Sequence, residues 1–176
     1  MRPPRMTERA TRPGARFALR SGRGFTLIEL MISITILAIL VSVAAPSLSS
    51  LVRDQRVKTA TFDVYAGLAY ARSEAIKRNA TVDITPNGAD WGGGWRIQSG
   101  GTALKNQDAF SKISIGGPAG TVTYQRDGRI SGIAAPMFVV KSAEDNTITA
   151  RCVRVDLSGR PNIKVDTNKD PSDGCQ

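Results

Sequence analysis

Apolar and polar positions follow three different patterns along the chain, and the first of them is a long apolar run. From Leu30 to Val52 no residue carries a formal charge, a run of 23 positions. As a helix, the apolar stretch 25–45 would be about 31 Å long, which is enough to cross the hydrocarbon core of a bilayer. Because this stretch is apolar on every side, it predicts a membrane helix and not an amphipathic surface helix.

The second pattern is a helical stripe that begins beyond Pro46, a residue that should kink or loosen the helix. Apolar residues recur there at steps of three or four: Val57, Ala60, Val64, Leu68, Ala71 and Ala75. Glu74 can pair with Lys77 or Arg78, and Asn79 is a suitable left-handed stop. A helix from Phe25 to Asn79 would have 55 residues and a length of about 82 Å. The stripe predicts the face that packs on a sheet.

The third pattern consists of short β-like runs separated by Gly, Pro and Asn. Seven runs are expected to be strands: Thr81–Thr85, Trp95–Gln98, Lys112–Ile115, Thr121–Gln125, Met137–Lys141, Ile148–Leu157 and Ile163–Val165. In the sixth run the apolar parity switches between Cys152 and Val153, which predicts either a bulge or a strand covered on both faces. The chain therefore has an α+β pattern with one modest core.

Composition removes most catalytic chemistry. The 176 residues include no His and only two Cys, so the commonest hydrolase triads, four-Cys zinc sites and iron–sulfur clusters are excluded. The sequence has no G-x-S-x-G motif and no evident pair of catalytic carboxylates. We therefore expect a protein that is not an enzyme and uses no cofactor.

The basic charge is concentrated at the N-terminus. The chain has a formal charge of +9, and residues 1–24, with seven Arg and one Glu, contribute +6 of it. This segment, rich in Pro and Gly, is typical of a disordered or targeting segment, and a nucleic-acid-binding arm is the alternative. Beside an apolar helix, seven Arg predict that this flank stays in the cytoplasm.

The junction between the two segments is Gly24 followed by Phe25-Thr26-Leu27-Ile28-Glu29-Leu30. G-FTLIEL before an apolar helix resembles the signal of type IV prepilins and type II secretion pseudopilins. The resemblance implies that prepilin peptidase cuts between Gly24 and Phe25 and methylates the new N-terminal amine of Phe25. Glu29 would then be the fifth mature residue and would neutralise the N-terminal ammonium of a neighbouring subunit. The start codon, Met1 or Met6, does not move this cleavage site.

Four further stretches resemble minor pilins of the GspH/FimT type: ARSEAIKRN (71–79), WGGGW (91–95), VTYQRDGRISG (122–132) and VRVDLSGRP (153–161). The resemblance implies a type IV pilin-like fold, with a long N-terminal helix packed on a C-terminal antiparallel β-sandwich-like domain. For Trp91 and Trp95 we expect core and loop anchoring and not ligand binding.

The resemblance also implies an organisation and a location. The expected parts are a cleaved leader (1–24), a transmembrane and assembly helix (25–46), an amphipathic helix (47–79) and a periplasmic β domain (80–176). The protein would span the bacterial inner membrane once and enter a pilus or pseudopilus. Its expected partners are other pilins or pseudopilins, prepilin peptidase and the inner-membrane assembly platform.

Cys152 and Cys175 would lie in the oxidising periplasm under this topology. We therefore expect a disulfide that ties the C-terminus to a strand, and two free thiols are the alternative. Such a bridge could stabilise the domain by about 3 kcal/mol.

DNA is an alternative partner. Some FimT-like minor pilins bind DNA through a Gly-Arg-x-Arg loop, which here corresponds to Gly159-Arg160-Pro161-Asn162, with Asn162 in place of the second Arg. The basic candidates are Arg151, Arg154, Arg160 and Lys164. Together with Asp156 they give residues 151–164 a charge of +3, whereas residues 165–176 carry −2. This small patch predicts weak, salt-sensitive phosphate contact at best, and a solvated hairpin face is the alternative.

A weak calcium candidate follows directly after these basic residues. Asp166, Asn168, Asp170 and Asp173 place oxygen atoms at spacings found in calcium loops. However, Pro171 stands where an EF-hand needs Gly, so a polar turn before the disulfide is the alternative.

Two functional hypotheses follow. The first is a structural subunit of a type II secretion pseudopilus or type IV pilus, acting in filament assembly or initiation and in protein secretion. The second is a DNA-binding minor pilin for natural transformation.

Overall fold

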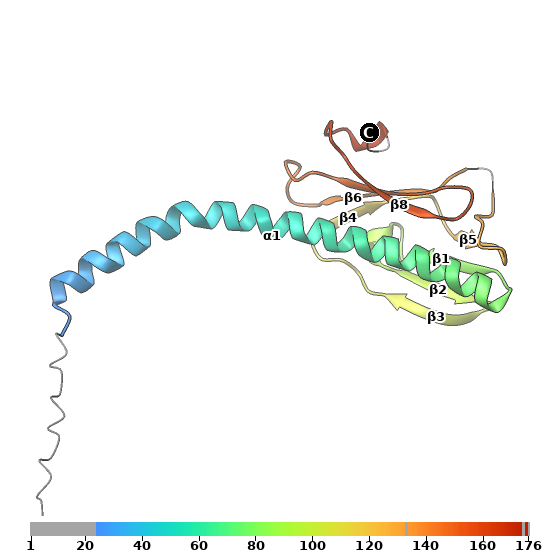
Figure 1. The fold of residues 1–176 in the computed structure, drawn as a ribbon, viewed down its shortest axis with the longest axis horizontal. Helices are drawn as coiled ribbons and strands as arrows, with labels where there is room; N and C mark the ends of the chain where they lie inside the picture. The colour runs from blue at the N-terminus through green and yellow to red at the C-terminus, as the bar shows by residue number, and fades with distance from the viewer. Residues whose placement is uncertain (1–23, 133, 174, 176) are drawn as a thin grey trace, which may run out of the picture. The chain divides into compact units, whose positions relative to one another are not determined.

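The computed structural model describes residues 24–132, 134–173 and 175, and at residues 43–46 it describes the backbone alone. Among the described residues, one long helix, α1 (Leu27–Arg78), is followed by eight strands (Figure 1). The strands are β1 (Val82–Pro86), β2 (Trp95–Ser99), β3 (Thr102–Gln107), β4 (Ile113–Gly116), β5 (Val122–Tyr124), β6 (Met137–Ser142), β7 (Arg151–Val155) and β8 (Pro161–Val165). Two short 3₁₀ helices span Trp91–Gly93 and Pro171–Asp173.

Local chemistry sets both ends of α1. At its start the backbone N–H of Glu29 donates to Oγ1 of Thr26 at 3.2 Å, so Thr26 caps the helix. At its end Asn79 adopts φ 50°, and the N–H of Ala80 donates to the carbonyl of Ala75 at 3.2 Å. The left-handed stop predicted at Asn79 is therefore confirmed. The loosening expected at Pro46 falls within residues 43–46, whose side chains lie outside the described part.

The chain separates into two compact units, Met1–Val41 and Ser42–Gln176. In the first unit, the described residues form an apolar helical segment whose large side chains are all more than half exposed, from Leu27 at 76% to Ile36 at 53%. By length and composition, no single described helix qualifies as a membrane span, whereas Leu27–Ser42 and Ser47–Arg78 qualify as a pair.

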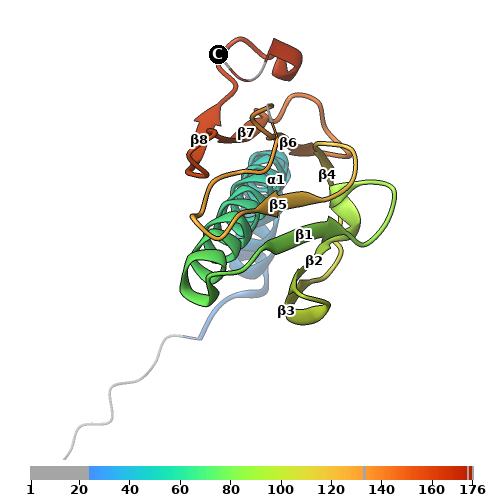
Figure 2. The same cartoon turned by 90° about the vertical axis from the view of Figure 1, so that its right-hand side faces the viewer.

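The second unit contains two four-stranded antiparallel sheets around the later part of α1. Their strand orders are β3-β2-β1-β5 and β4-β6-β7-β8. Every member of the predicted helical stripe, from Val57 to Ala75, is 3% exposed or less and belongs to one core with residues of both sheets. In the end-on view of Figure 2, β7 and β8 lie above α1, while β1 and β2 lie to its right. This arrangement confirms the predicted α+β fold class.

Strand β7 explains the parity switch near Cys152. Its pairing with β6 and β8 has no register shift, so the expected alternative of a bulge is wrong. Val153 and Val155 face the core, while Cys152 is fully buried on the opposite face, where it bonds to Cys175. The strand is therefore covered on both faces. The irregularity lies instead between β2 and β3, at Ile97 and Gln98.

Strand β3 was not predicted. Its sequence, TALKNQ, lacks alternating apolar residues because the strand lies at the edge of its sheet and none of its residues is buried. Backbone pairing with β2 positions it, and Leu104 packs against the core from this edge.

Candidate functional site

The described N-terminal segment presents its expected processing residues to the surroundings. Phe25 is 73% exposed, and nothing lies within 4 Å of the position that a Cβ at Gly24 would occupy. Glu29 lies one turn into the helix and is also exposed. The leader up to residue 23, including Met1 and Met6, lies outside the described residues.

Thr26 is a helix-capping residue next to the expected processing site that sequence reasoning missed. Its side chain occupies the N-cap position and Glu29 the third helical position, which is the spacing of a capping box. The signal was present in the sequence as Thr-x-x-Glu before an apolar run. The same Glu29 that would neutralise a neighbour's ammonium therefore also sits in the first turn, where a negative charge is favoured.

The large apolar side chains of this segment are exposed on all sides of the helix. Large residues on all sides of a helix remain in contact with water unless lipid or other helices cover them. The segment is therefore built to lie in a membrane or against other apolar helices.

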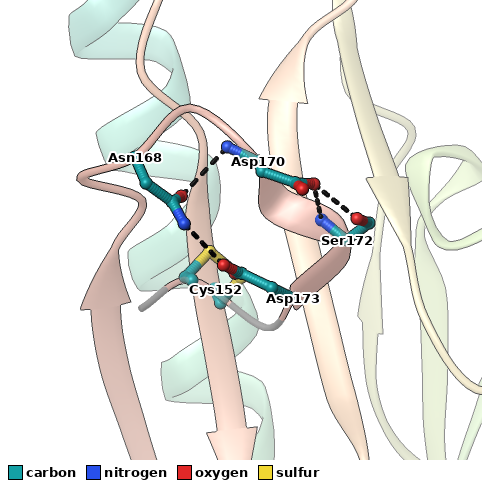
Figure 3. The surroundings of a disulfide bond; sticks show 6 residues. Cys152, Asn168, Asp170, Ser172 and Asp173 are labelled. Atoms are coloured by element: carbon teal, nitrogen blue, oxygen red, sulfur yellow. Dashed lines mark hydrogen bonds between the residues drawn. A yellow bond between two sulfur atoms is a disulfide. The ribbon is translucent and has the colours of Figure 1, made fainter.

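The C-terminal segment is attached to β7 through the disulfide of Cys152 and Cys175, whose Cα atoms are 5.9 Å apart (Figure 3). The acidic residues before Cys175 form a turn. Asn168 accepts from the backbone of Asp170 at 3.0 Å and donates to Oδ2 of Asp173 at 2.5 Å. The carboxylate of Asp170 accepts hydrogen bonds from the hydroxyl of Ser172 and from the backbone N–H of Ser172, the latter at 3.1 Å. These two bonds lower the pKa of Asp170.

This geometry does not assemble the calcium candidate. Oδ1 of Asn168 and Oδ1 of Asp170, which could have been calcium ligands, accept hydrogen bonds within the turn itself. Asp166 is buried with one carboxylate oxygen unpartnered. Within residues 24–132, 134–173 and 175, no group of three or more acidic or Cys side chains could hold a metal ion. These contacts form a polar turn before the disulfide.

The four basic candidates for DNA contact do not share one surface. Strand pairing places Arg154 opposite Asn162 and Lys164 opposite Cys152, so Arg154 and Lys164 lie on the same outer face. Arg151 points to the other face, and its buried Nε has no hydrogen-bond partner among the described residues. Arg160 lies in the β7–β8 turn. The expected patch is therefore reduced to two neighbouring side chains.

Three of the four family-like stretches meet at one end of the β domain. The Nε of Arg72 donates to the carbonyl of Gly128 at 3.1 Å. A Cβ at Gly159 would lie 1.9 Å from the same carbonyl oxygen, so only glycine fits there. Gly128 and Gly159 both adopt positive φ, 78° and 81°. We name this junction of Arg72, Gly128 and Gly159 the glycine clasp.

The fourth stretch, WGGGW, anchors the core as predicted. Trp91 and Trp95 are 4% and 3% exposed, with ring centroids 6.4 Å apart. The indole of Trp91 donates to the carbonyl of Pro118 at 3.0 Å. A Cβ at Gly67 would lie 2.9 Å from the indole nitrogen of Trp95, so α1 needs a residue without a side chain at this crossing.

Charged side chains link α1 to the loops around it. Arg53 contacts Asp145 at 2.7 Å, and hydrogen bonds from Thr147 and then Arg53 lower the pKa of Asp145.

Within α1, Glu74 pairs with Arg78 at 2.6 Å and Lys77 at 3.3 Å, which confirms the predicted pairs. Hydrogen bonds from Arg78 and Lys77 lower the pKa of Glu74.

Family comparison now adds to this geometry. The model of the family described as Type II transport protein GspH matches residues 60–159, which is more than half of the chain. The chain belongs to the GspH family. The model of the prokaryotic N-terminal methylation motif matches residues 19–45. The family resemblance seen in the sequence is thereby confirmed.

Solved structures show the same fold. Two crystal forms of the type IV minor pilin FimU from Pseudomonas aeruginosa are similar to this GspH-family chain, with TM-scores of 0.56 and 0.54. Both are 21% identical and cover 62% and 61% of this chain, and 89% and 91% of their own. No curated protein sequence matches the chain.

Together these findings establish the coarse function. A GspH-family chain with an N-terminal methylation motif is a membrane-anchored subunit of a pilus or pseudopilus, and it assembles with other pilins. The family consists of structural subunits and is not known for catalysis.

Proposed function

We propose that the chain is a minor pilin or pseudopilin that prepilin peptidase cuts between Gly24 and Phe25 and methylates at Phe25. The observation that carries this proposal is the match of residues 19–45 to the methylation motif in a chain whose later part matches the GspH family. The exposure of Gly24 and Phe25 supports it, because a peptidase needs access to both sides of the bond.

Glu29 has a specific role in this proposal. A carboxylate on an apolar helix is costly unless it is paired. The new N-terminal ammonium of Phe25 is equally costly when a filament buries it. Pairing Glu29 of one subunit with the ammonium of the next turns two unpaired charges into one pair. It also sets the axial position of each subunit.

The same proposal fixes the topology. Residues 1–24, with seven Arg, stay in the cytoplasm until they are removed, residues 25–46 cross the inner membrane, and residues 80–176 lie in the periplasm. The disulfide supports this side for the β domain, because such bonds persist in oxidising compartments. Prepilin peptidase and an inner-membrane assembly platform are the partners that this route requires.

The charge of Glu29 provides the test. We expect Glu29→Ala and Glu29→Gln to leave the chain in the membrane fraction but to reduce its amount in sheared filaments by about tenfold or more. Glu29→Asp keeps the charge and should recover part of that loss. Normal filament content in the Glu29→Ala strain would refute the role of Glu29. A deletion strain scored for secretion, twitching and transformation would distinguish the pseudopilus from the pilus.

DNA uptake is the alternative function, and the observation that favours it is the shared outer face of Arg154 and Lys164. If this face binds phosphate, Arg154→Ala with Lys164→Ala should abolish duplex binding at low salt. The control pair is Arg96→Ala with Lys105→Ala on the other sheet. No binding by the unaltered protein, or equal binding by both double variants, would refute this function.

A further inference from the structure

A second apolar stripe runs along α1 beside the core-facing stripe. Phe62, Tyr65, Ala69 and Ile76 follow one another at steps of three, four and seven residues, so they share a helix face. Phe62 is 63% exposed, Ile76 49% and Tyr65 37%. We call these four residues the outer stripe.

A surface cavity of about 410 Å³ lies at the C-terminal part of the outer stripe. Tyr65, Ala69 and Ile76 line it together with Pro161, and Ser73 adds a hydroxyl. The two other lining residues are Arg72 and Arg160. Apolar and aromatic side chains therefore line the cavity together with two arginines.

The fold orients the side chain of Arg72 and fixes the backbone of Arg160. Arg72 donates through Nε to the carbonyl of Gly128 at 3.1 Å, which orients its guanidinium group beside the glycine clasp. The backbone N–H of Arg160 donates to Asp156 at 2.9 Å, and Pro161 begins β8 directly after it. A carboxylate that binds here would meet one guanidinium group, that of Arg72, that is already oriented, so less entropy would be lost on binding.

The charges at this site indicate the sign of its partner. Of the described residues that line the cavity, two are arginines and none is acidic. Asp156, the acidic residue nearest in sequence to Arg160, accepts bonds from Ser158 and from the backbone of Arg160. The cavity is therefore suited to an anionic group.

We propose that the outer stripe and its cavity bind a neighbouring pilin subunit through a segment that presents a carboxylate beside an apolar side chain. This inference rests on the proposed function as a filament subunit. Arg and Tyr are the residues that most often dominate protein interfaces, and here they adjoin an exposed apolar strip on the same helix that enters the filament.

The apolar part of the surface favours a protein partner over a nucleic acid. Phe62 lies one helical turn before Tyr65, outside the cavity, and extends the apolar surface away from the arginines. A phosphate backbone could pair with Arg160 but would leave this apolar strip uncovered. An exposed apolar patch next to a charged rim is typical of a protein–protein contact.

The experiment uses the full-length chain in its host and measures its amount in sheared filaments. We expect Arg160→Glu to lower this amount by about tenfold, equivalent to about 1.4 kcal/mol, with Arg160→Lys closer to wild type. Phe62→Ser should also lower it. Arg154→Glu, a charge reversal on the outer face of the sheet, is the matched control and should stay near wild type. The thermal midpoints of the purified variants report whether each has folded.

The outcomes are distinguishable. Absence of the wild-type chain from filaments would refute the proposed function, and the inference with it. Wild-type filament content in Arg160→Glu and Phe62→Ser would overturn the inference alone. Loss of DNA retention in Arg160→Glu, with filament content unchanged, would also overturn it and would assign the cavity to nucleic acid.

Discussion

Gly159 shows how a single residue determines whether two hairpins can meet. It adopts φ 81°, and a Cβ there would lie 1.9 Å from the carbonyl oxygen of Gly128. We expect Gly159→Ala to lower the free energy of unfolding by about 3 kcal/mol or more. The control is Gly120→Ala, where φ is also 81° but no atom lies within 4 Å of a Cβ, with an expected cost of about 1–2 kcal/mol. Equal costs in chemical denaturation would show that the close contact is absent.

Glu74 makes a second prediction at the residue scale. Hydrogen bonds from Arg78 and Lys77 lower its pKa in the folded state, so its contribution to stability is present above the unfolded pKa and is lost as pH falls through the folded pKa. We expect Glu74→Gln to reduce the acid-induced fall of the thermal midpoint between neutral pH and about pH 3. Asp108→Asn, at an exposed loop position after β3, is the control. An unchanged slope in Glu74→Gln would contradict the prediction.

Single residues were predictable where local chemistry decides their conformation. Asn79 ends α1 as expected, because Asn tolerates the left-handed region better than most residues. Asp166 was not predictable in the same way. Its spacing to Asn168 and Asp170 fits a calcium loop, but strand β8 ends just before it and the backbone N–H of Asp166 pairs with Ala150, so its side chain becomes buried apart from the turn.

At the scale of the element, the core-facing stripe of α1 can be tested with one substitution at two positions. Leu68 is 2% exposed, whereas Leu51 on the same helix is 60% exposed. We expect Leu68→Ala to cost about 2–5 kcal/mol, because it leaves a cavity between the helix and the sheets. Leu51→Ala should change the unfolding free energy of the detergent-solubilised chain little. Similar losses at both positions would mean that the stripe is not the core face.

The C-terminal segment depends on the disulfide. We expect nonreducing mass analysis of the exported protein to find Cys152 and Cys175 protected from alkylation. Replacing both with Ser should lower stability by about 3 kcal/mol, because the reduced chain gains freedom mainly in the unfolded state. If both thiols react with the alkylating reagent before reduction, the bridge does not form in the cell.

Elements with internal periodicity were predictable, and elements defined by their neighbours were not. The spacing from Val57 to Ala75 alone identified the buried face of α1. By contrast, β3 has no apolar pattern, since an edge strand needs only a partner for its backbone. The parity switch in β7 left two explanations open, and the choice between them depended on a segment more than 20 residues away, at Cys175.

For the whole molecule, the net charge gives a misleading first impression of function. Of the formal charge of +9, the expected leader contributes +6 and the remaining chain only +3. Under the function we propose, the basic excess is therefore mainly a signal of topology and processing. The structure further separates the four basic candidates for DNA contact. Arg160 lies beside α1, Arg154 and Lys164 lie on the outer face of the sheet, and Arg151 lies on its inner face.

The two units have different requirements for stability. Residues 42–176 contain a core in which both sheets and α1 take part, whereas the described residues up to Val41 expose apolar side chains on all sides. The second unit can bury its own apolar surface, but the first needs lipid or the helices of other subunits. This asymmetry is what a subunit needs if it waits in a membrane and then moves into a filament.

The mass of the N-terminal peptide, measured on the chain recovered from sheared filaments, tests most directly whether this protein is a processed filament subunit. We predict a peptide that begins at Phe25 and carries one methyl group on its amine, and no peptide from residues 1–24. A chain in the filament fraction that retains its leader, or a chain confined to the membrane fraction with Phe25 unmodified, would contradict the proposed function.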